Sequence, residues 1–223
     1  MNGYSWDFSV ISSGWPQLMS GLAITLQLTV ICAVIGLVGG FLVCLMAMSR
    51  FLPLRWLAVT FIELFRCTPA LVQIIWIFYC LPFFFGIFID PFTMAILALG
   101  MNITAFNAEA YRAAIQAIPS SHYDAGTALG LSAFKRTIYI VLPQALLIAI
   151  PVLLTNTIGL LQQTSLVAIV AIGDLMYQGK SLATQSYRPI EIYSAVALIY
   201  FLFSLPLSQI VGYCEKRLRD RLA

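Results

Sequence analysis

One short stretch of this chain brings together the residue types of a hydrolytic site. His122, the only histidine, follows Ser121 directly and stands two residues before Asp124. A nucleophile, a base and an orienting acid act through side-chain geometry, which near neighbours on one short helix cannot reach. The sequence also lacks the glycine-lysine motif that cradles ATP phosphates. We therefore expect neither an enzyme nor an ATP site on this chain.

The five cysteines are an odd number, and their spacing fits no metal site. All of them fall in or beside apolar segments, so we interpret them as small buried hydrophobic residues. They are Cys32, Cys44, Cys67, Cys80 and Cys214. We expect no metal and no other cofactor on this chain.

The composition is that of a membrane protein. Hydrophobic residues make up 61% of the chain and charged residues only 9%, whereas a soluble protein carries about a quarter charged residues. No charged residue occurs from Phe8 to Ser49. A helix needs ~20 apolar residues to cross a bilayer. The fold class we expect is an all-α polytopic membrane protein, in contact with lipid and without a nucleic-acid partner.

Five segments are long enough to span the membrane. They are about 16–48, 57–84, 92–117, 137–166 and 191–214. The first is expected to be one long, tilted helix in which Gly36, Gly39 and Gly40 allow close helix packing. Pro69 is expected to kink the second. The segment between the last two spans, 173–191, is expected to form an external loop with short helical pieces.

The basic residues predict the orientation of the chain. With five spans, the loops at 49–56 and 113–136 share one side with the carboxyl tail. That side holds Arg50, Arg55, Arg112, Lys135, Arg136, Lys216, Arg217, Arg219 and Arg221, and the other keeps Lys180 and Arg188. The positive-inside rule then places the amino terminus on the outer side of the membrane and the carboxyl terminus in the cytoplasm.

The cytoplasmic loop at about 119–132 predicts a short helix. Pro119 should end the third span, and Ser121 with Asp124 forms the pattern of a capping box. Gly130 can take the left-handed conformation that stops a helix, and Ser132 should begin the next one. A helix of about nine residues follows. It is either a lever that fits a groove on another protein or a turn lying on the membrane surface.

Two ion pairs are possible at membrane depth. Glu63 and Arg66 are three residues apart, as are Glu109 and Arg112, so each pair shares a helical face. We expect Glu109 and Arg112 to be structural. Arg66 either pairs with Glu63, or extends toward the headgroups, or contributes to a transport path or gate.

Neutral polar residues also lie at membrane depth. They include Asn102, Thr104 and Asn107, and then Thr155, Asn156, Gln162, Gln163, Thr164 and Ser165. They either satisfy one another across helices or line a pathway for a polar solute. Our candidate pathway residues are Arg66, Asn102, Asn156, Gln162, Gln163, Thr164 and Ser165. A neutral lining would suit a zwitterion with an amide or acidic side chain.

The loop from Asp124 through Ala125 and Gly126 to Gly130, followed by Leu142 and Pro143, resembles the cytoplasmic "EAA" loop of ABC importer permeases. Almost the whole chain is similar to permeases of the polar amino acid uptake family, the histidine, glutamate and glutamine type. The similar segments are Gly21–Thr25, Phe65–Gln73, Glu109–Ile115, Leu142–Ala145 and Thr164–Leu166.

This resemblance implies a single transmembrane domain, 1–223, with the type I ABC importer permease fold. The loop would be a coupling helix that docks on an ATP-hydrolysing subunit. Its docking residues would be Ser121, His122, Asp124, Ala125, Gly126, Gly130 and Leu131. The implied partners are two ATPase subunits carrying ATP and Mg, a second permease chain, identical or similar, and an extracytoplasmic binding protein. A polar amino acid would cross the bacterial inner membrane, and the outer side, which holds the amino terminus, would be the periplasm.

Two other functions compete with the importer. An ion-gradient-driven secondary transporter needs a titratable group within the membrane, and Glu63 is the candidate. An intramembrane enzyme needs a nucleophile and a base that converge, which the sequence lacks. The loop around Asp124 argues for the importer.

Overall fold

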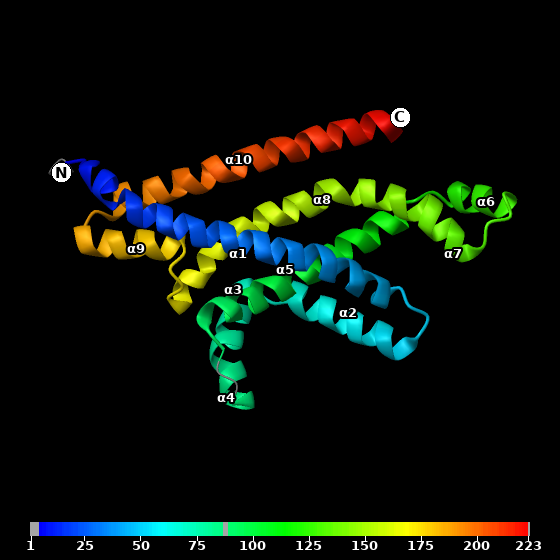
Figure 1. The fold of residues 1–223 in the computed structure, drawn as a ribbon, viewed down its shortest axis with the longest axis horizontal. Coiled ribbons are helices and arrows are strands. Elements are labelled where there is room, and N and C mark those ends of the chain that lie inside the picture. The colour runs from blue at the N-terminus through cyan, green and yellow to red at the C-terminus, as the bar shows by residue number, and fades with distance from the viewer. Residues whose placement is uncertain (1–4, 87–88, 223) are drawn as a thin grey trace. The chain divides into compact units, whose positions relative to one another are not determined.

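The computed structural model describes residues 5–86 and 89–222, and side chains up to residue 217 (Figure 1). The described residues form helices joined by short connections. The α-helices are α1 Ser9–Ala47, α2 Leu52–Cys67, α3 Ala70–Ile75, α4 Leu81–Phe85, α5 Pro91–Gln116, α6 Ser120–Ala128, α7 Ala133–Arg136, α8 Leu142–Gln163, α9 Leu175–Ser186 and α10 Pro189–Leu222. Trp76–Cys80 and Thr137–Val141 are π-helical, and Thr164–Val170 is a 3₁₀-helix.

Four helical stretches among the described residues are long and apolar enough to cross a membrane. They are Ser9–Ala47, Pro91–Gln116, Ala133–Val170 and Pro189–Arg217. A fifth span exists only if Leu52–Cys67 and Ala70–Phe85 count together, and these two are bent by 110°. The expected all-helical polytopic fold is confirmed, with four to five candidate spans.

The second segment differs from the continuous helix expected at 57–84. The kink predicted at Pro69 is a complete break, because α2 ends at Cys67 and Thr68 is extended, with φ −109° and ψ 143°. Proline clashes with a helical residue before it and lacks the amide of the helix ladder. The Thr68 hydroxyl donates to the Leu64 carbonyl, 2.7 Å away, and so closes the last turn of α2.

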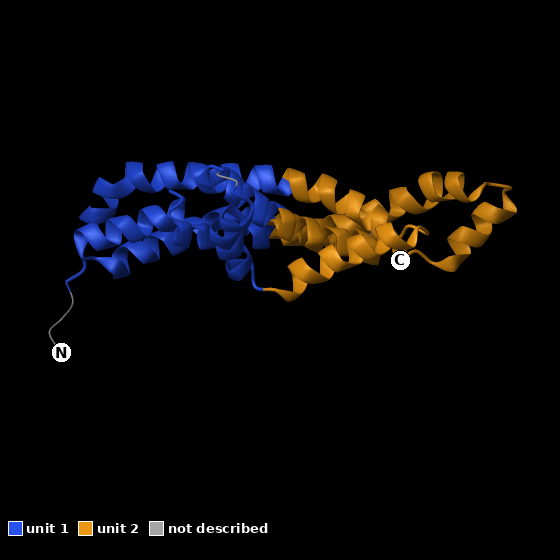
Figure 2. Ribbon diagram, turned by 90° about the horizontal axis from the view of Figure 1, so that it is seen from below, with its two compact units in different colours: residues 1–33, 69–100, 158–207 blue, residues 34–68, 101–157, 208–223 orange. Residues whose placement is uncertain are grey.

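The described residues divide into two compact units (Figure 2). The first comprises residues 1–33, 69–100 and 158–207. Its core joins α1, α9 and α10, and its buried residues are Leu18, Leu22, Leu175, Leu182, Ala183, Ile192, Val196 and Ile199. The amphipathic helix α9, which lies in the expected loop at 173–191, therefore buries its apolar side inside this unit.

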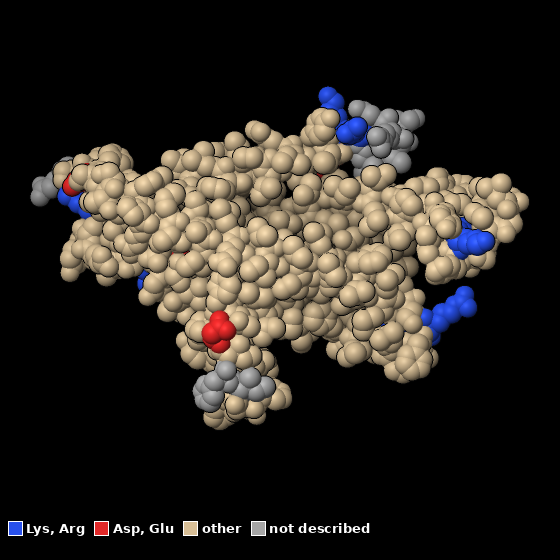
Figure 3. All heavy atoms as spheres, in the orientation of Figure 1, with Lys and Arg blue, Asp and Glu red and all other residues tan. Residues whose placement is uncertain are grey.

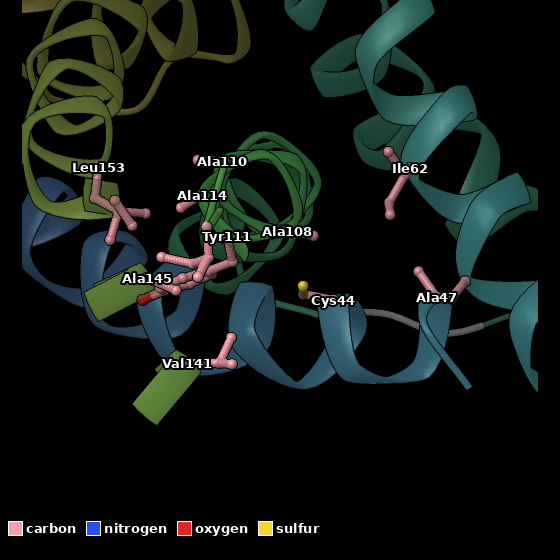
Figure 4. Close-up of a cluster of buried hydrophobic side chains, with 13 residues drawn as sticks. Cys44, Ala47, Ile62, Ala108, Ala110, Tyr111, Ala114, Val141, Ala145 and Leu153 are labelled. Carbon is pink, nitrogen blue, oxygen red and sulfur yellow. The ribbon is translucent and has the colours of Figure 1, made fainter. Parts of the chain in front are cut away.

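The second unit comprises residues 34–68, 101–157 and 208–223. In Figure 4 the small side chains of Ala108, Ala110 and Ala114 on α5 lie at the centre of its core. The glycine face predicted on α1 packs here. A Cβ atom at Gly40 would lie 2.7 Å from the Cβ of Asn107, and one at Gly36 would lie 2.7 Å from the Ile103 side chain. Close packing of this face is confirmed.

The surface and the cysteines show where the expectations hold. Charged side chains occupy a small part of the face drawn in Figure 3.

Cys32 and Cys44 are buried as expected, but Cys67 is exposed in the last turn of α2, so that interpretation was wrong for Cys67. No cluster of three or more His, Cys, Asp or Glu suited to a metal occurs among the described residues.

Candidate functional site

The loop helix α6 has the predicted length of nine residues and the predicted end. Gly130 adopts the left-handed conformation with φ 72°. Its amide donates to the Thr127 carbonyl at 2.9 Å, and the next amide, of Leu131, donates to the Gly126 carbonyl at 3.1 Å. Glycine tolerates this conformation because it has no Cβ atom.

The capping box predicted at the start of α6 is wrong. The helix begins one residue earlier, at Ser120, with Pro119 in the cap position and no side-chain cap. Ser121 and Asp124 therefore lie inside the helix, because the proline already sets the extended conformation at its start. The cap predicted at Ser132 is confirmed, since its hydroxyl accepts from the Lys135 amide at 3.4 Å.

The helix α6 is held against the segment that leads into α8 (Figure 1). The Arg136 guanidinium lies 5.6 Å from the centre of the Tyr123 ring and donates to the hydroxyl of Thr127. Gly126 is buried, and a Cβ atom there would lie 2.9 Å from the Arg136 side chain and 3.0 Å from that of Ile140. These contacts attach α6 to α7 and to the π-helical segment Thr137–Val141 that precedes α8.

The opposite side of this loop is free within the described chain. Of the predicted docking residues, Ser121, Asp124, Ala125 and Gly130 are exposed, His122 and Leu131 are partly buried, and Gly126 is buried. Two large apolar residues that were not predicted, Leu129 and Phe134, are 75% and 74% exposed on this loop. The sequence signal that could have identified them is the presence of large apolar residues within a polar loop. Each is a large apolar side chain exposed on this loop, and such side chains often mark a surface that binds another protein.

The predicted pathway residues fall into both units. Arg66, Asn102 and Asn156 lie in the second. The Asn156 amide donates to Oδ1 of Asn107 at 3.0 Å, and Nδ2 of Asn102 donates to the Phe65 carbonyl at 3.3 Å. These asparagines therefore satisfy partners across helices, which was one of the two interpretations.

Of the three alternatives for Arg66, the pair with Glu63 is wrong, because Arg66 forms its ion pair with another helix. Its Nη1 lies 3.8 Å from Oε1 of Glu109 on α5. Arg112 pairs with the same carboxylate, as predicted, and its Nε donates to Oε2 at 2.9 Å. The packing of α2 on α5 supplies a nearer partner than the local spacing does. One carboxylate thus faces two guanidinium groups within this unit.

The first unit contains a hollow of about 410 Å³. Its lining residues are Gln162, Ser165, Met176, Tyr193, Val196, Ala197 and Tyr200. Gln162 and Ser165 are predicted pathway residues, whereas Gln163 and Thr164 do not line it. Thr164 is buried, and its hydroxyl donates to the Leu161 carbonyl at 2.7 Å. The two tyrosines were missed, because the sequence does not show which helix packs beside 162–165.

Beside this hollow a buried carboxylate caps α9. Asp174 is 0% exposed and accepts hydrogen bonds from the amides of Met176 and Tyr177, at 3.1 and 3.0 Å. Its Oδ2 lies 3.5 Å from the Tyr200 hydroxyl. Burial raises the pKa of Asp174 to about 6, although the two amides act in the opposite direction. Asp174 precedes an apolar helical pattern, which was the available signal for a cap.

Comparison with known proteins gives one family. Its profile, described as "Binding-protein-dependent transport system inner membrane component", matches residues 36–220. The glutamine transport system permease protein GlnP of Escherichia coli K12 is 35% identical over 96% of this chain and 98% of its own length. The L-cystine transport system permease protein TcyB of Bacillus subtilis is 33% identical over 96% and 91%.

A solved structure of an amino acid ABC transporter with histidines superposes with a TM-score of 0.90 at 34% identity, covering 96% of this chain and 100% of that one. The methionine ABC transporter MetNI, at 20% identity and a TM-score of 0.61 over 95% of each chain, shares the fold. The type I importer permease fold is therefore confirmed.

These relatives lend no support to the secondary transporter built on Glu63. The chain is the inner-membrane permease subunit of an ABC importer, and ATP hydrolysis belongs to a separate subunit. An ATPase and a binding protein are thus its partners in general terms. On this family match and whole-length similarity, the chain belongs to the binding-protein-dependent transport system inner membrane components.

Proposed function

We propose that this permease carries a polar amino acid from the periplasm to the cytoplasm of a bacterial cell. The observation that supports this most is whole-length similarity to an amino acid ABC transporter, with a TM-score of 0.90 and 96% of this chain covered. The relatives are named for glutamine, L-cystine, arginine and glutamate or aspartate. The chemistry common to those substrates is the α-amino acid zwitterion.

The hollow lined by Gln162 and Ser165 is the proposed contact site for this zwitterion. Its side chains are all neutral, and the hydroxyls of Tyr193 and Tyr200 add donors and acceptors. Neutral hydrogen-bonding groups replace the hydration of an ammonium and a carboxylate without favouring either charge. Such a lining suits an amino acid with an amide or acidic side chain. The other candidate pathway residues are proposed only because the sequence places them within the membrane spans. They are Arg66, Asn102, Asn156, Gln163 and Thr164.

The surface of α6 is the proposed docking site for the ATPase. Exposed Ser121, Asp124 and Ala125, with the apolar Leu129 and Phe134, would enter a groove on that subunit. Two ATPase subunits with their ATP and Mg, and a second permease chain, complete the proposed assembly. ATP binding would move α6, and the contact of Gly126 with Arg136 would pass this movement into the π-helical segment Thr137–Val141 before α8.

The proposed orientation places the amino terminus in the periplasm and the carboxyl terminus in the cytoplasm. The basic residues at 49–56, 113–136 and the carboxyl tail support it, because positive charge is retained in cytoplasmic loops. In this orientation α6 faces the cytoplasm. The helix α9, one span later, faces the periplasm.

Uptake into proteoliposomes tests the substrate. The chain is reconstituted with its ATPase and binding protein, and a panel of labelled amino acids is offered. We expect one polar amino acid to accumulate, and Gln162→Leu to slow its uptake. Gln209→Leu, which changes an exposed glutamine on α10 outside the hollow, should not. ATP hydrolysis without uptake of any amino acid would overturn the proposed substrate class.

A further inference from the structure

The exposed side of α9 is a polar surface whose residues do not line the hollow beside Gln162. Its residues are Lys180, Ser181, Thr184 and Gln185, continued past the helix end by Tyr187; we call them the α9 face. With Tyr177, four of these residues line a hollow of about 360 Å³ on the helix. Lys180, Thr184 and Gln185 are exposed. The Lys180 ammonium has no ion pair within the described residues.

The other side of α9 is fixed tightly to its unit. A Cβ atom at Gly179 would lie 2.6 Å from the Val196 side chain, and one at Gly21 would lie 2.8 Å from the Asp174 carbonyl oxygen. Leu175 and Leu182 are buried in the same core. The α9 face is therefore held at a fixed position on α1 and α10, as a recognition surface requires.

A second observation lies at the end of the helix. Tyr187 has a left-handed backbone with φ 55° and a side chain that is 88% exposed. A bulky residue in this conformation is strained, so the fold holds an aromatic ring outward at the carboxyl end of α9 at a conformational cost. Tyrosine is among the residues that contribute most to protein interfaces.

We propose that the α9 face docks the extracytoplasmic binding protein, with Lys180 meeting a carboxylate of the partner and Tyr187 serving as an aromatic anchor. The partner class comes from the family, whose members depend on a binding protein. The side comes from topology, because one span, Ala133–Val170, separates α9 from the cytoplasmic loop. The inference rests on the proposed orientation and function.

A lipid surface fits the α9 face less well. An interfacial helix inserts its apolar side into the bilayer, but the apolar side of α9 is buried against α1 and α10. The side left free offers hydroxyls, an amide and a single lysine. Binding to anionic membranes usually depends on a cluster of basic residues.

The test is binding-protein-stimulated ATP hydrolysis by the assembled complex in nanodiscs. The readout is the concentration of binding protein that gives half-maximal stimulation. Lys180→Glu should raise it by about fivefold or more, since attraction becomes repulsion. Tyr187→Asn should raise it too, and asparagine accepts the left-handed backbone, so the fold is kept. The control Arg50→Glu reverses an exposed charge in the loop before α2 and should leave the value unchanged.

Four outcomes would overturn the inference or the function beneath it. Unchanged values in both α9 variants would exclude docking at this face. A shift seen only in nanodiscs with anionic lipid, and absent in phosphatidylcholine, would make lipid the occupant. Dissociation of the permease pair in Lys180→Glu would make it a second copy of the chain. Absence of stimulation in the unaltered complex would instead contradict the proposed function.

Discussion

The side-chain amide of Asn156 donates to Oδ1 of Asn107 over 3.0 Å, and this hydrogen bond joins α8 to α5. Asn107 is 0% exposed, and its own Nδ2 finds no acceptor within the described chain. Its carbonyl oxygen therefore depends on Asn156. The bond thus joins α5, which precedes α6 in the chain, to α8, which follows it.

Removing this bond should destabilise the permease. Asn156→Ala leaves the buried Oδ1 of Asn107 unpaired, so we expect the free energy of unfolding to fall by about 1–2 kcal/mol. Thermal unfolding in detergent measures the effect. Thr157→Val is the control, because the Thr157 hydroxyl bonds only to the Leu153 carbonyl of its own helix. Equal stability of the two variants would contradict a contribution from the Asn107 bond.

The glycine face of α1 gives a packing prediction. In Gly40→Ala the new Cβ atom would meet the Cβ of Asn107 at 2.7 Å and the backbone nitrogen of Ala108 at 3.1 Å. Neither atom is the end of a flexible side chain, so we expect a loss of about 1–3 kcal/mol. Gly212→Ala on α10, with nothing within 4 Å of its Cβ, is the matched control. If Gly40→Ala unfolds at the same temperature as Gly212→Ala, the close approach of α1 to α5 is disproved.

Asp174 gives a prediction on pH. Its folded-state pKa is about 6 against an ordinary value of 3.8. Between these values the unfolded chain releases the proton that the folded chain keeps. The free energy of unfolding therefore falls as pH rises from about 4 to about 6, and above about 6 it no longer changes through this group. The whole loss should be roughly 3 kcal/mol.

The variant Asp174→Asn should lack this loss, because its amide oxygen can still cap α9 but carries no charge. The measurement is the difference in Tm between acidic and neutral pH, compared with the unaltered protein. Asp90→Asn is the control. Hydrogen bonds from Thr93 lower the pKa of Asp90, so its contribution is lost as pH falls. Identical pH profiles for Asp174→Asn and the unaltered protein would refute a neutral buried Asp174.

The end of α6 gives a prediction on coupling. Gly130→Ala and Gly86→Ala each place a Cβ atom at a left-handed position, φ 72° and φ 62°, with nothing within 4 Å. The strain should be about 1 kcal/mol in each, so the two should lose similar stability. Only Gly130→Ala should reduce ATP-driven uptake, because only Gly130 ends α6, the proposed coupling helix. Equal uptake in the two variants would remove α6 from the coupling pathway.

Features set by neighbours in sequence were predictable. The stop at Gly130 and the cap at Ser132 follow from turn and cap chemistry, and the glycine face of α1 follows from helical spacing. The capping box at Ser121 failed although its pattern was complete, since Pro119 already occupies the cap position and the helix starts at Ser120. The local rules thus predicted that a helix is present here, but not the residue at which it begins.

Features set by packing were not predictable. A pair with Glu63 on its own helix was one alternative for Arg66. Arg66 instead reaches Glu109 on α5, because contact between helices overrides local spacing. The hollow beside Gln162 takes Tyr193 and Tyr200 from α10. No pattern in the sequence states which faces of α8 and α10 meet. Pro69 predicted a kink, but not a bend of 110°.

The most direct test of the central claim is the energy source of uptake. Proteoliposomes with the permease, its ATPase and its binding protein are loaded with ATP or with a non-hydrolysable analogue, and ionophores abolish all ion gradients. We predict that labelled amino acid accumulates only with hydrolysable ATP and that ionophores do not change the rate. Uptake that persists without ATP and stops when the ion gradients collapse would contradict an ATP-driven importer.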